Sequence, residues 1–407
     1  MKQFIYMLSV VFFLLLCVGC TQADIVLPEA GGKDDIEQGV PLSVKHLGLS
    51  LEIESRSVVT GGPMDGAINP NPLTTVGLCV TKQSSNGVVS AYASGNNTQV
   101  FTFDALAVPA AWQLAEGEEI LLLFSEEGTV YGFSPAERNV SLSGTPREPL
   151  MSGVKMLDKQ KFYFSDGGNP VDASTDIQWE TDQDDYLYCT VPDKVDRWHP
   201  EVSLTMNHAL AKVSFRVLEM DGGAVFADAS VKKVVLKSAD GFKKSSSAKL
   251  NLATGDLSGT MTAVDELWFT ADGDMRTVGS NVVDVSDVAV QAFGLVIPVT
   301  GVVATLEMTL DDDRMFTMTP PGGSGSVGSF MVNWIKGNNY IYNIRLSPQG
   351  VVIDNIEVAD WGDGGSTEVP VERFDDESYS QVSSRDGGCR CDVPRRFGGL
   401  RKLDLRR

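Results

Sequence analysis

The chain has 407 residues, enough for two domains that each bury a core of their own. Its formal net charge is -21 and its isoelectric point is about 4.5. This balance argues against nucleic acid as a partner, because neutralising phosphates requires clustered Lys and Arg. No membrane-spanning body is indicated, and acidity spread along a chain is typical of a well-solvated surface.

The N-terminus has the layout of a secretory signal peptide. A basic Met-Lys start is followed by the almost wholly apolar Phe4–Leu16, and the small residue Gly19 precedes Cys20. The apolar run is too short to cross a membrane as a helix. A Cys at this place also resembles a bacterial lipobox, although Cys17 stands where Leu is usual. We expect residues 1–19 to be removed and Cys20 to carry lipid, with simple signal cleavage as the alternative.

Four cysteines then remain, and none of them implies chemistry. Cys79 and Cys189 are compatible with a disulfide in an oxidising compartment and equally with two buried free thiols. The pair Cys389 and Cys391 has no nearby His, which makes it a weak metal signal. We predict no metal site and no cofactor.

The first half of the chain predicts a lipid tether followed by a β domain. Residues 20–56 form a polar segment and then a strand, in which Leu47–Ile53 alternates apolar and polar residues and ends just before Arg56, the first arginine. On sequence alone Arg56 is a solvated residue after a strand. Residues 57–198 carry short apolar runs separated by Gly, Pro, Asn and Ser, which is typical of a β-sandwich. The runs are Val76–Val80, Val88–Tyr92, Val100–Phe103, Ile120–Phe124, Val130–Phe133 and Tyr186–Val191.

The stretch Leu204–Leu218 lies at the expected boundary between two β domains. Its apolar residues recur at every second position, but they change parity partway along. Side chains alternate faces with a period of two, so the change requires a bulge or bend near Ala209–Ala211. We place the boundary in Asp193–Glu201 and a second domain at residues 199–365.

The second half of the chain also predicts strands, followed by a basic tail. A hairpin is expected where Ala248–Leu252 meets the turn before Leu257. Residues 366–407 do not resemble a packed core, and their last part is rich in Arg and Gly, so disorder is the expectation. A basic tail that docks on an acidic neighbour or on lipopolysaccharide is the alternative. The remaining expected strands are Val231–Leu236, Ala292–Val299, Val302–Leu310, Tyr340–Ile344 and Ile353–Trp361.

No catalytic constellation is present in the sequence. His46, His199 and His208 show no metal-ligand spacing, and apolar neighbours favour a buried structural role for His208. The acidic runs Asp182–Asp185 and Asp311–Asp313 are typical of solvated turns, although a loop calcium site remains an alternative. Four tryptophans could stack on sugars or pack in cores: Trp112, Trp179, Trp198 and Trp268.

Several separated motifs together resemble the fimbrillin family of surface lipoproteins. None is specific alone, and the resemblance lies in their order and spacing over most of residues 1–365. The motifs are the Cys20 start, the strand before Arg56, Asn207–Val213, Leu250–Gly255, Ile297-Pro298, and Trp334, Gly337, Tyr340, Tyr342 and Ile344 followed by Trp361. The resemblance implies an all-β protein of two tandem transthyretin-like β-sandwich domains, exported as a lipoprotein to the cell outer membrane and assembled into surface-exposed adhesive fimbriae of the type V pilus class.

The resemblance also implies assembly with other fimbrial subunits by strand exchange. An arginine-specific protease would cut after Arg56 and release Leu47–Ile53, and a neighbour's C-terminal strand would take its place. This sequence departs from a simple stalk subunit, because its best donor candidate, Glu368–Glu372, is short and contains a proline. An accessory, tip or anchor subunit is therefore expected. The alternative is a surface glycan-binding lipoprotein that does not polymerise, and an enzyme has no positive support.

Overall fold

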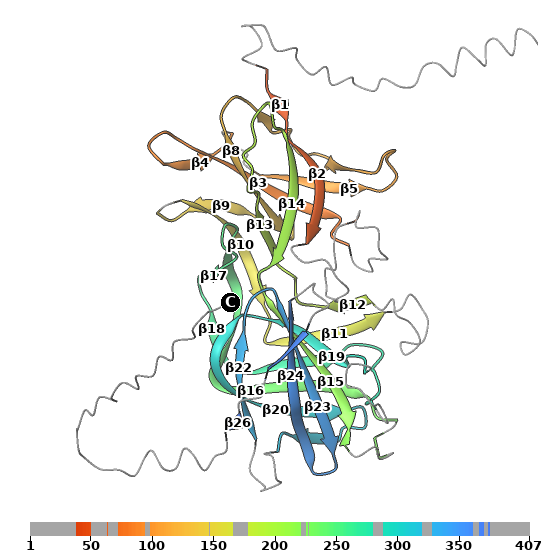
Figure 1. The fold of residues 1–407 in the computed structure, drawn as a ribbon. Helices are drawn as coiled ribbons and strands as arrows, with labels where there is room; N and C mark the ends of the chain where they lie inside the picture. Colours follow the sequence, from red (N-terminus) through yellow and green to blue (C-terminus); the bar gives the residue numbers. More distant parts are fainter. Residues whose placement is uncertain are drawn as a thin grey trace, which may run out of the picture.

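The computed structural model describes residues 38–369 and 373–374, except for 50–62, 64–71, 94–97, 146, 166–177, 221–224, 227, 280–287, 320–327 and 361–365. Its named elements are all strands, which confirms the predicted all-β fold class. Within these residues no helix is long and apolar enough to cross a membrane. The strands gather into two lobes. Figure 1 shows the first lobe, mostly red to orange with β14 in light green, above the second, mostly green to blue with β11 and β12 in yellow.

The first lobe is built on an eight-stranded sheet. Its order is β2 (Ser43–Leu49), β14 (Glu201–His208), β13 (Leu187–Thr190), β8 (Gly128–Ser134), β3 (Thr75–Gln83), β5 (Thr98–Asp104) and β6 (Ala111–Leu114), with β4 (Val89–Ala91) beside β3. A separate pair joins β1 (Val40–Pro41) to β7 (Leu122–Leu123). The ladders are antiparallel except for the parallel pairing of β2 with β14.

The second lobe packs an eleven-stranded sheet against a five-stranded one. The larger sheet runs β12 (Gln178–Thr181), β11 (Lys159–Ser165), β18 (Thr262–Ala271), β16 (Val231–Asn251), β20 (Val299–Leu310), β22 (Ser329–Trp334) and β26 (Arg373–Phe374). Its branches are β9 (Val140–Ser143), β10 (Glu148–Met156), β17 (Leu257–Ser258) and β21 (Met315–Thr317). The smaller sheet runs β19 (Ala292–Val296), β15 (Ala211–Glu219), β23 (Asn338–Ser347), β24 (Gly350–Asp360) and β25 (Ser366–Val369).

The chain passes between the lobes more than once. Strands β10, β11 and β12 precede residue 199 but pair within the second lobe, while β14 follows residue 199 and pairs within the first. The long strand β16 pairs with β18 and β20 along its first part and with β10 and β17 along its last part. The expected domain limits 57–198 and 199–365 stay a prediction. On each side of residue 199, some strands pair with strands of the other lobe's sequence range.

The stretch Leu204–Leu218 is where the chain changes lobe. Strand β14 ends at His208, Ala209 and Leu210 form a bend, and β15 starts at Ala211 in the five-stranded sheet. The parity change read from the sequence therefore corresponds to a real bend between two sheets. It is an interruption between two strands and not a bulge within one.

Three apolar clusters form the core, and one of them joins the lobes. The first lobe is filled by residues such as Leu47, Leu78 and Leu204, and the second by an aromatic-rich cluster that includes Phe215. The third cluster contains Phe133 from the first lobe and, from the second lobe, residues that include Leu250 and Leu295. Because these side chains are buried together, the lobes share packed apolar surface.

Several expected strands are confirmed, and the tail needs a correction. Strands β3, β5 and β8 contain the apolar runs predicted there, and β16 and β17 form the expected hairpin with Leu250 opposite Leu257. In the run Ile120–Phe124 only β7 is a strand. The segment 366–407 was expected to lie outside the fold, yet β25 pairs with β24 and β26 pairs with β22. Residues 375–407 lie outside the described part of the chain.

Candidate strand-exchange site

Strand β2 closes the first lobe at the edge of its sheet. Val44, Leu47 and Leu49 are buried, and Lys45 is exposed. The register places Leu47 beside Leu204 in the parallel ladder with β14. The predicted first strand is thus present, although it begins at Ser43 and the residues from Ser50 to Arg56 are not described.

The surroundings of β2 show what it covers. It pairs with β14 on one side and contacts β6, at the other end of the sheet, on the other. Two backbone hydrogen bonds hold the start of β2. The amide of Leu42 donates to the carbonyl oxygen of Leu121 at 3.1 Å, and the amide of Ser43 donates to the carbonyl oxygen of Pro200 at 2.9 Å. Without β2, the backbone edge of β14 would face solvent and the apolar side chains beneath would be uncovered.

The predicted processing positions lie on either side of β2 in the sequence. Cys20 and Arg56 both lie outside the described residues, as do Cys389 and Cys391. Lipidation at Cys20 and cleavage after Arg56 therefore stay predictions. Arg56 follows the last residue of β2 by seven positions in the sequence, so a cut there would separate β2 from the remainder of the chain.

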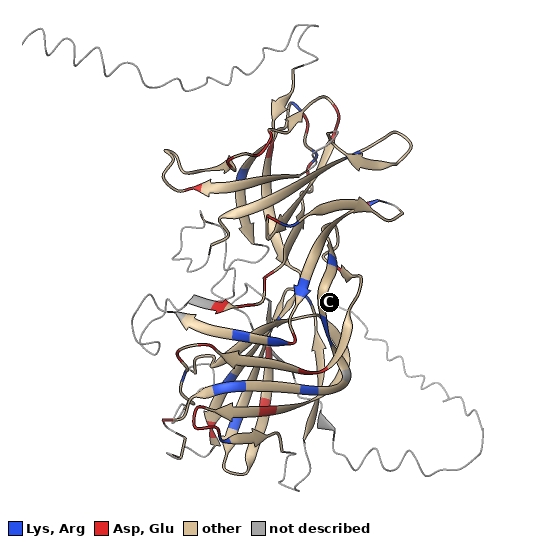
Figure 2. Ribbon diagram, turned by 180° about the vertical axis from the view of Figure 1, so that it is seen from behind, with Lys and Arg blue, Asp and Glu red and all other residues tan. Residues whose placement is uncertain are grey.

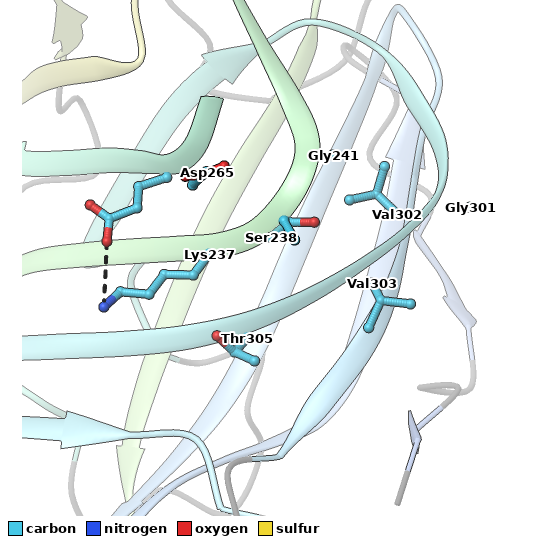
Figure 3. Close-up of a pocket in the computed structure, with 10 residues that line it drawn as sticks. Lys237, Ser238, Gly241, Asp265, Gly301, Val302, Val303 and Thr305 are labelled. Atoms are coloured by element: carbon cyan, nitrogen blue, oxygen red, sulfur yellow. Dashed lines mark ion pairs between the residues drawn. The ribbon is translucent and has the colours of Figure 1, made fainter. Parts of the chain in front are cut away.

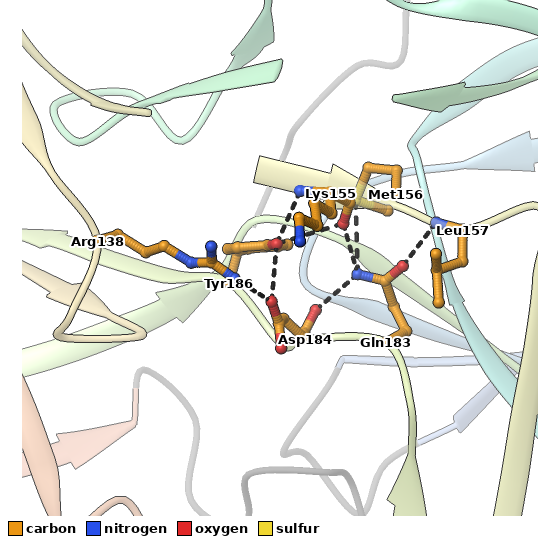
Figure 4. Close-up of polar contacts among 7 residues, drawn as sticks. All are labelled: Arg138, Lys155, Met156, Leu157, Gln183, Asp184 and Tyr186. Carbon is orange, nitrogen blue, oxygen red and sulfur yellow. Dashed lines mark hydrogen bonds and ion pairs between the residues drawn. The ribbon is translucent and has the colours of Figure 1, made fainter. Parts of the chain in front are cut away.

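A polar cluster holds the joint between the lobes (Figure 4). Tyr186 accepts a hydrogen bond from the amide of Lys155 at 2.8 Å and donates to Asp184 at 3.1 Å. Arg138 pairs with the same carboxylate. Gln183 accepts from the amide of Leu157 at 2.8 Å and so ties the segment before β13 to β10 and β11. Burial raises the pKa of Tyr186, which keeps the phenol a neutral donor.

The loop after β16 forms a second contact across the joint. Gly255 has φ +74, and a Cβ there would lie 2.0 Å from the Tyr188 ring of β13. Lys336 donates to the carbonyl oxygen of Thr254 at 2.5 Å and pairs with Asp256 at 2.7 Å. The last residue of the Leu250–Gly255 motif therefore has a structural role, because only glycine fits this close approach to Tyr188 at positive φ.

His208 is buried, and its Nδ1 lies 3.1 Å from the Asp185 carboxylate. This agrees with the structural role expected from its apolar neighbours. Asp185 was expected in a solvated turn and is instead buried. Lys212, the second residue of β15, is also buried. Burial lowers its pKa to about 7, although the negative charge of Asp185 acts to raise it. The alternation pattern gave no signal for this burial.

The remaining candidate residues show no common site. Cys79 and Cys189 are buried free thiols, which resolves the alternative left open by the sequence, and burial raises the pKa of Cys189 to about 11. Trp112 is buried beside Phe103, and the ring of Trp268 has Lys159 at 4.0 Å and Lys233 at 4.5 Å. Trp198 is 65% exposed, and the side chain of Trp179 is not described.

The described residues contain no group of His, Cys, Asp or Glu that could hold a metal ion. A surface hollow of about 940 Å³ lies where β16 and β20 separate, and its lining includes Ser238, Gly241 and Val302 (Figure 3). Beside it Lys237 pairs with Glu307 at 2.7 Å. Basic and acidic residues are interspersed over the strands of the second lobe (Figure 2), so no basic stripe forms on its described part.

Residues 161–361, about half of the chain, match the model of the fimbrillin-like family, and this part of the chain is fimbrillin-like. No curated protein matches it in sequence.

Solved structures give further likenesses. A candidate cell adhesion protein from Bacteroides ovatus has a TM-score of 0.47 and 18% identity, covering 80% of this chain and 98% of its own. A fimbrial protein from Bacteroides vulgatus has a TM-score of 0.41 and 12% sequence identity, and the match covers 79% of this chain and 99% of that protein. The C-terminally truncated tip fimbrial protein Mfa3 from Porphyromonas gingivalis has a TM-score of 0.32 and 10% sequence identity, and the match covers 72% of this chain and 95% of that protein. All three scores lie below 0.5, so these likenesses assign no function.

Proposed function

We propose that the chain is a non-enzymatic fimbrial subunit of the type V pilus class, of accessory, tip or anchor type, which contributes to cell adhesion at the cell surface. The match to the fimbrillin-like family supports this class. The arrangement of β2 carries the assembly part of the proposal. It is an edge strand whose apolar side chains fill the first lobe, and it is joined to the rest through the segment that contains Arg56.

Assembly would proceed in three steps. The chain is anchored in the outer membrane through lipid on Cys20 and folds with β2 in place. Cleavage after Arg56 then separates β2 from the body. A strand from a neighbouring subunit finally pairs with β14 and fills the groove that β2 leaves, because unpaired backbone groups and apolar side chains both favour a replacement.

The C-terminal end supports the accessory, tip or anchor assignment. The expected donor segment Glu368–Glu372 begins within β25, where Glu368 lies opposite Glu357 and Val369 opposite Ile356 of β24. Its first part is therefore paired within its own chain, and Pro370 follows directly. A subunit with this end is better suited to accept a strand than to donate one.

Two finer assignments belong to the same proposal. The lobes correspond to two tandem transthyretin-like sandwiches with the limits 57–198 and 199–365, allowing for the strands that cross between them.

The alternative function is a glycan-binding lipoprotein that does not polymerise, and the exposed Trp198 is the observation in its favour. Saturable binding on a glycan array, lost in Trp198→Ala, would select that alternative.

The test replaces Arg56 with the recognition sequence of a protease that cuts nowhere else in the chain. After cleavage we expect the β2 fragment to dissociate and the body to form larger complexes with other fimbrial subunits that supply a donor strand, seen on size-exclusion chromatography. The uncut protein is the matched control. A cut protein that keeps the fragment and stays monomeric under all conditions would contradict the proposal.

A further inference from the structure

Four large apolar side chains are exposed at the end of the first lobe that faces away from the second lobe. We call them the distal patch: Ile120, Leu122, Phe124 and Trp198, which are 62%, 40%, 39% and 65% exposed. Exposed apolar residues are unremarkable when they are scattered singly. These four, however, come from two loops that are bonded to each other.

The contacts show that the two loops of the distal patch adjoin each other and β1. Strand β7 pairs with β1 so that Leu122 lies opposite Pro41, and a Cβ on Gly39 would lie 2.7 Å from the Cβ of Leu122 and 3.1 Å from the Phe124 ring. The amide of Arg197 donates to the carbonyl oxygen of Phe124 at 2.9 Å, which sets Trp198 beside it. Figure 1 places β1 at the far end of the first lobe.

The chain reaches this end from Cys20. The peptide between Cys20 and Gln38 can span no more than about 65 Å when fully extended. An anchor on Cys20 therefore holds the distal patch, at the end of the lobe where the chain enters, within about 65 Å of the lipid surface.

We propose that the distal patch rests on the phospholipid surface in which Cys20 is anchored. This inference rests on the proposed lipid at Cys20. A Trp and a Phe beside aliphatic residues suit the boundary between headgroups and acyl chains, where an aromatic ring has apolar and polar surroundings together. The contact orients the uncut subunit with its second lobe away from the membrane.

The charges beside the distal patch define the kind of contact. Glu119, Glu126 and Glu127 are exposed in the same loops, Glu126 pairs with Lys82 at 2.6 Å, and Arg197 precedes Trp198, so the described residues of the patch present no cluster of cations to anionic headgroups. Apolar insertion, and not pairing with phosphate, therefore carries the association. Binding to a zwitterionic surface should persist at high salt, in contrast to that of a basic surface patch.

The experiment uses the full chain from Cys20 with Cys389 and Cys391 replaced by Ser. Cys20 is coupled to a maleimide lipid in phosphatidylcholine vesicles whose acyl chains carry bromine, a quencher of tryptophan fluorescence. We expect quenching that Trp198→Phe largely removes. The pair Ile120→Ser and Leu122→Ser should lower the quenching of Trp198 at least about twofold, because it removes apolar surface that would enter the bilayer.

The matched control changes two exposed apolar residues outside the distal patch. Leu106 and Val108 are 92% and 98% exposed in the loop between β5 and β6, and Leu106→Ser with Val108→Ser should leave the quenching unchanged. Absent quenching of Trp198 on fully coupled protein, an equal loss in the control, or loss of quenching in high salt would each overturn the proposal.

A separate measurement keeps this inference distinct from the lipid anchor. Mass spectrometry of the protein isolated from cells shows whether Cys20 carries lipid. If it does not, the anchor proposal fails and the distal patch has no native membrane to rest on. If it does and the coupled protein shows no quenching, the anchor stands and the distal patch proposal fails.

Discussion

The two lobes complete their sheets in different ways. In the first lobe the parallel neighbour of β14 is β2, a strand of seven residues at the sheet edge, joined to the rest through the segment with Arg56. In the second lobe the parallel neighbour of β15 is β23, which lies in the middle of its sheet between β15 and β24. The same kind of ladder therefore lies at the sheet edge in one lobe and inside the sheet in the other.

The largest expected effect comes from placing a charge under β2. Leu47 is fully buried, and Leu47→Asp removes its packing and buries a carboxylate. We expect a loss of about 4 kcal/mol or more in the free energy of unfolding of the first lobe. Hydrogen exchange should show lost protection in β3 and β8, with β15 and β23 much less affected.

The control for this variant is Lys45→Ala, an exposed position on the same strand. It should change stability by less than about 0.5 kcal/mol. Equal loss of protection in both lobes for Leu47→Asp would contradict the difference between them.

An intermediate effect should follow from Lys212 at the start of the second lobe. Burial lowers its pKa to about 7, so between pH 7 and 10 the unfolded chain binds more protons than the folded one. Stability from this group therefore rises with pH in that window, by up to about 1.4 kcal/mol per unit.

The variant Lys212→Met should lack this rise. Urea unfolding at pH 7 and pH 9 is the measurement, and the stability difference between variant and parent should change by about 2 kcal/mol between the two. A difference that does not depend on pH would mean that Lys212 keeps its charge in the folded chain.

An effect of similar size is expected at the joint. In Gly255→Ala the new Cβ meets the Tyr188 ring at a residue with φ +74, and we expect a loss of about 2 kcal/mol in urea unfolding. Gly117→Ala is the matched control, because Gly117 has φ +87 and nothing within 4 Å of the new atom. Its loss should be about 1 kcal/mol, and equal losses would contradict a clash with Tyr188.

The sequence predicts the local features of this fold better than its long-range ones. Alternation located β3, β5, β8 and the change of lobe at Ala209, because a period of two is a local property. It did not show that β10 to β12 pair in the second lobe, since pairing partners far apart leave no local trace. Nor did it show the burial of Asp185 and Lys212, which depends on what packs over them.

The candidate site divides in the same way. The buried face of β2 and the structural role of His208 followed from apolar patterning. The exposure of Trp198 did not, since a single Trp in a loop carries no sign of which way it faces. The sequence could not predict the distal patch, because its residues come from the loops before β8 and β14, which only the fold brings together through the bond from Arg197 to Phe124.

The exchangeability of β2 is tested most directly by hydrogen exchange of the backbone amides in β14 before and after cleavage at position 56. We predict that the cut releases the β2 fragment and lowers protection of Ser203–Met206 at least about a hundredfold, while protection of β15 is unchanged. Adding a neighbouring subunit's donor strand should restore the protection. A fragment that stays bound, or β14 amides that remain protected after it has left, would contradict the account.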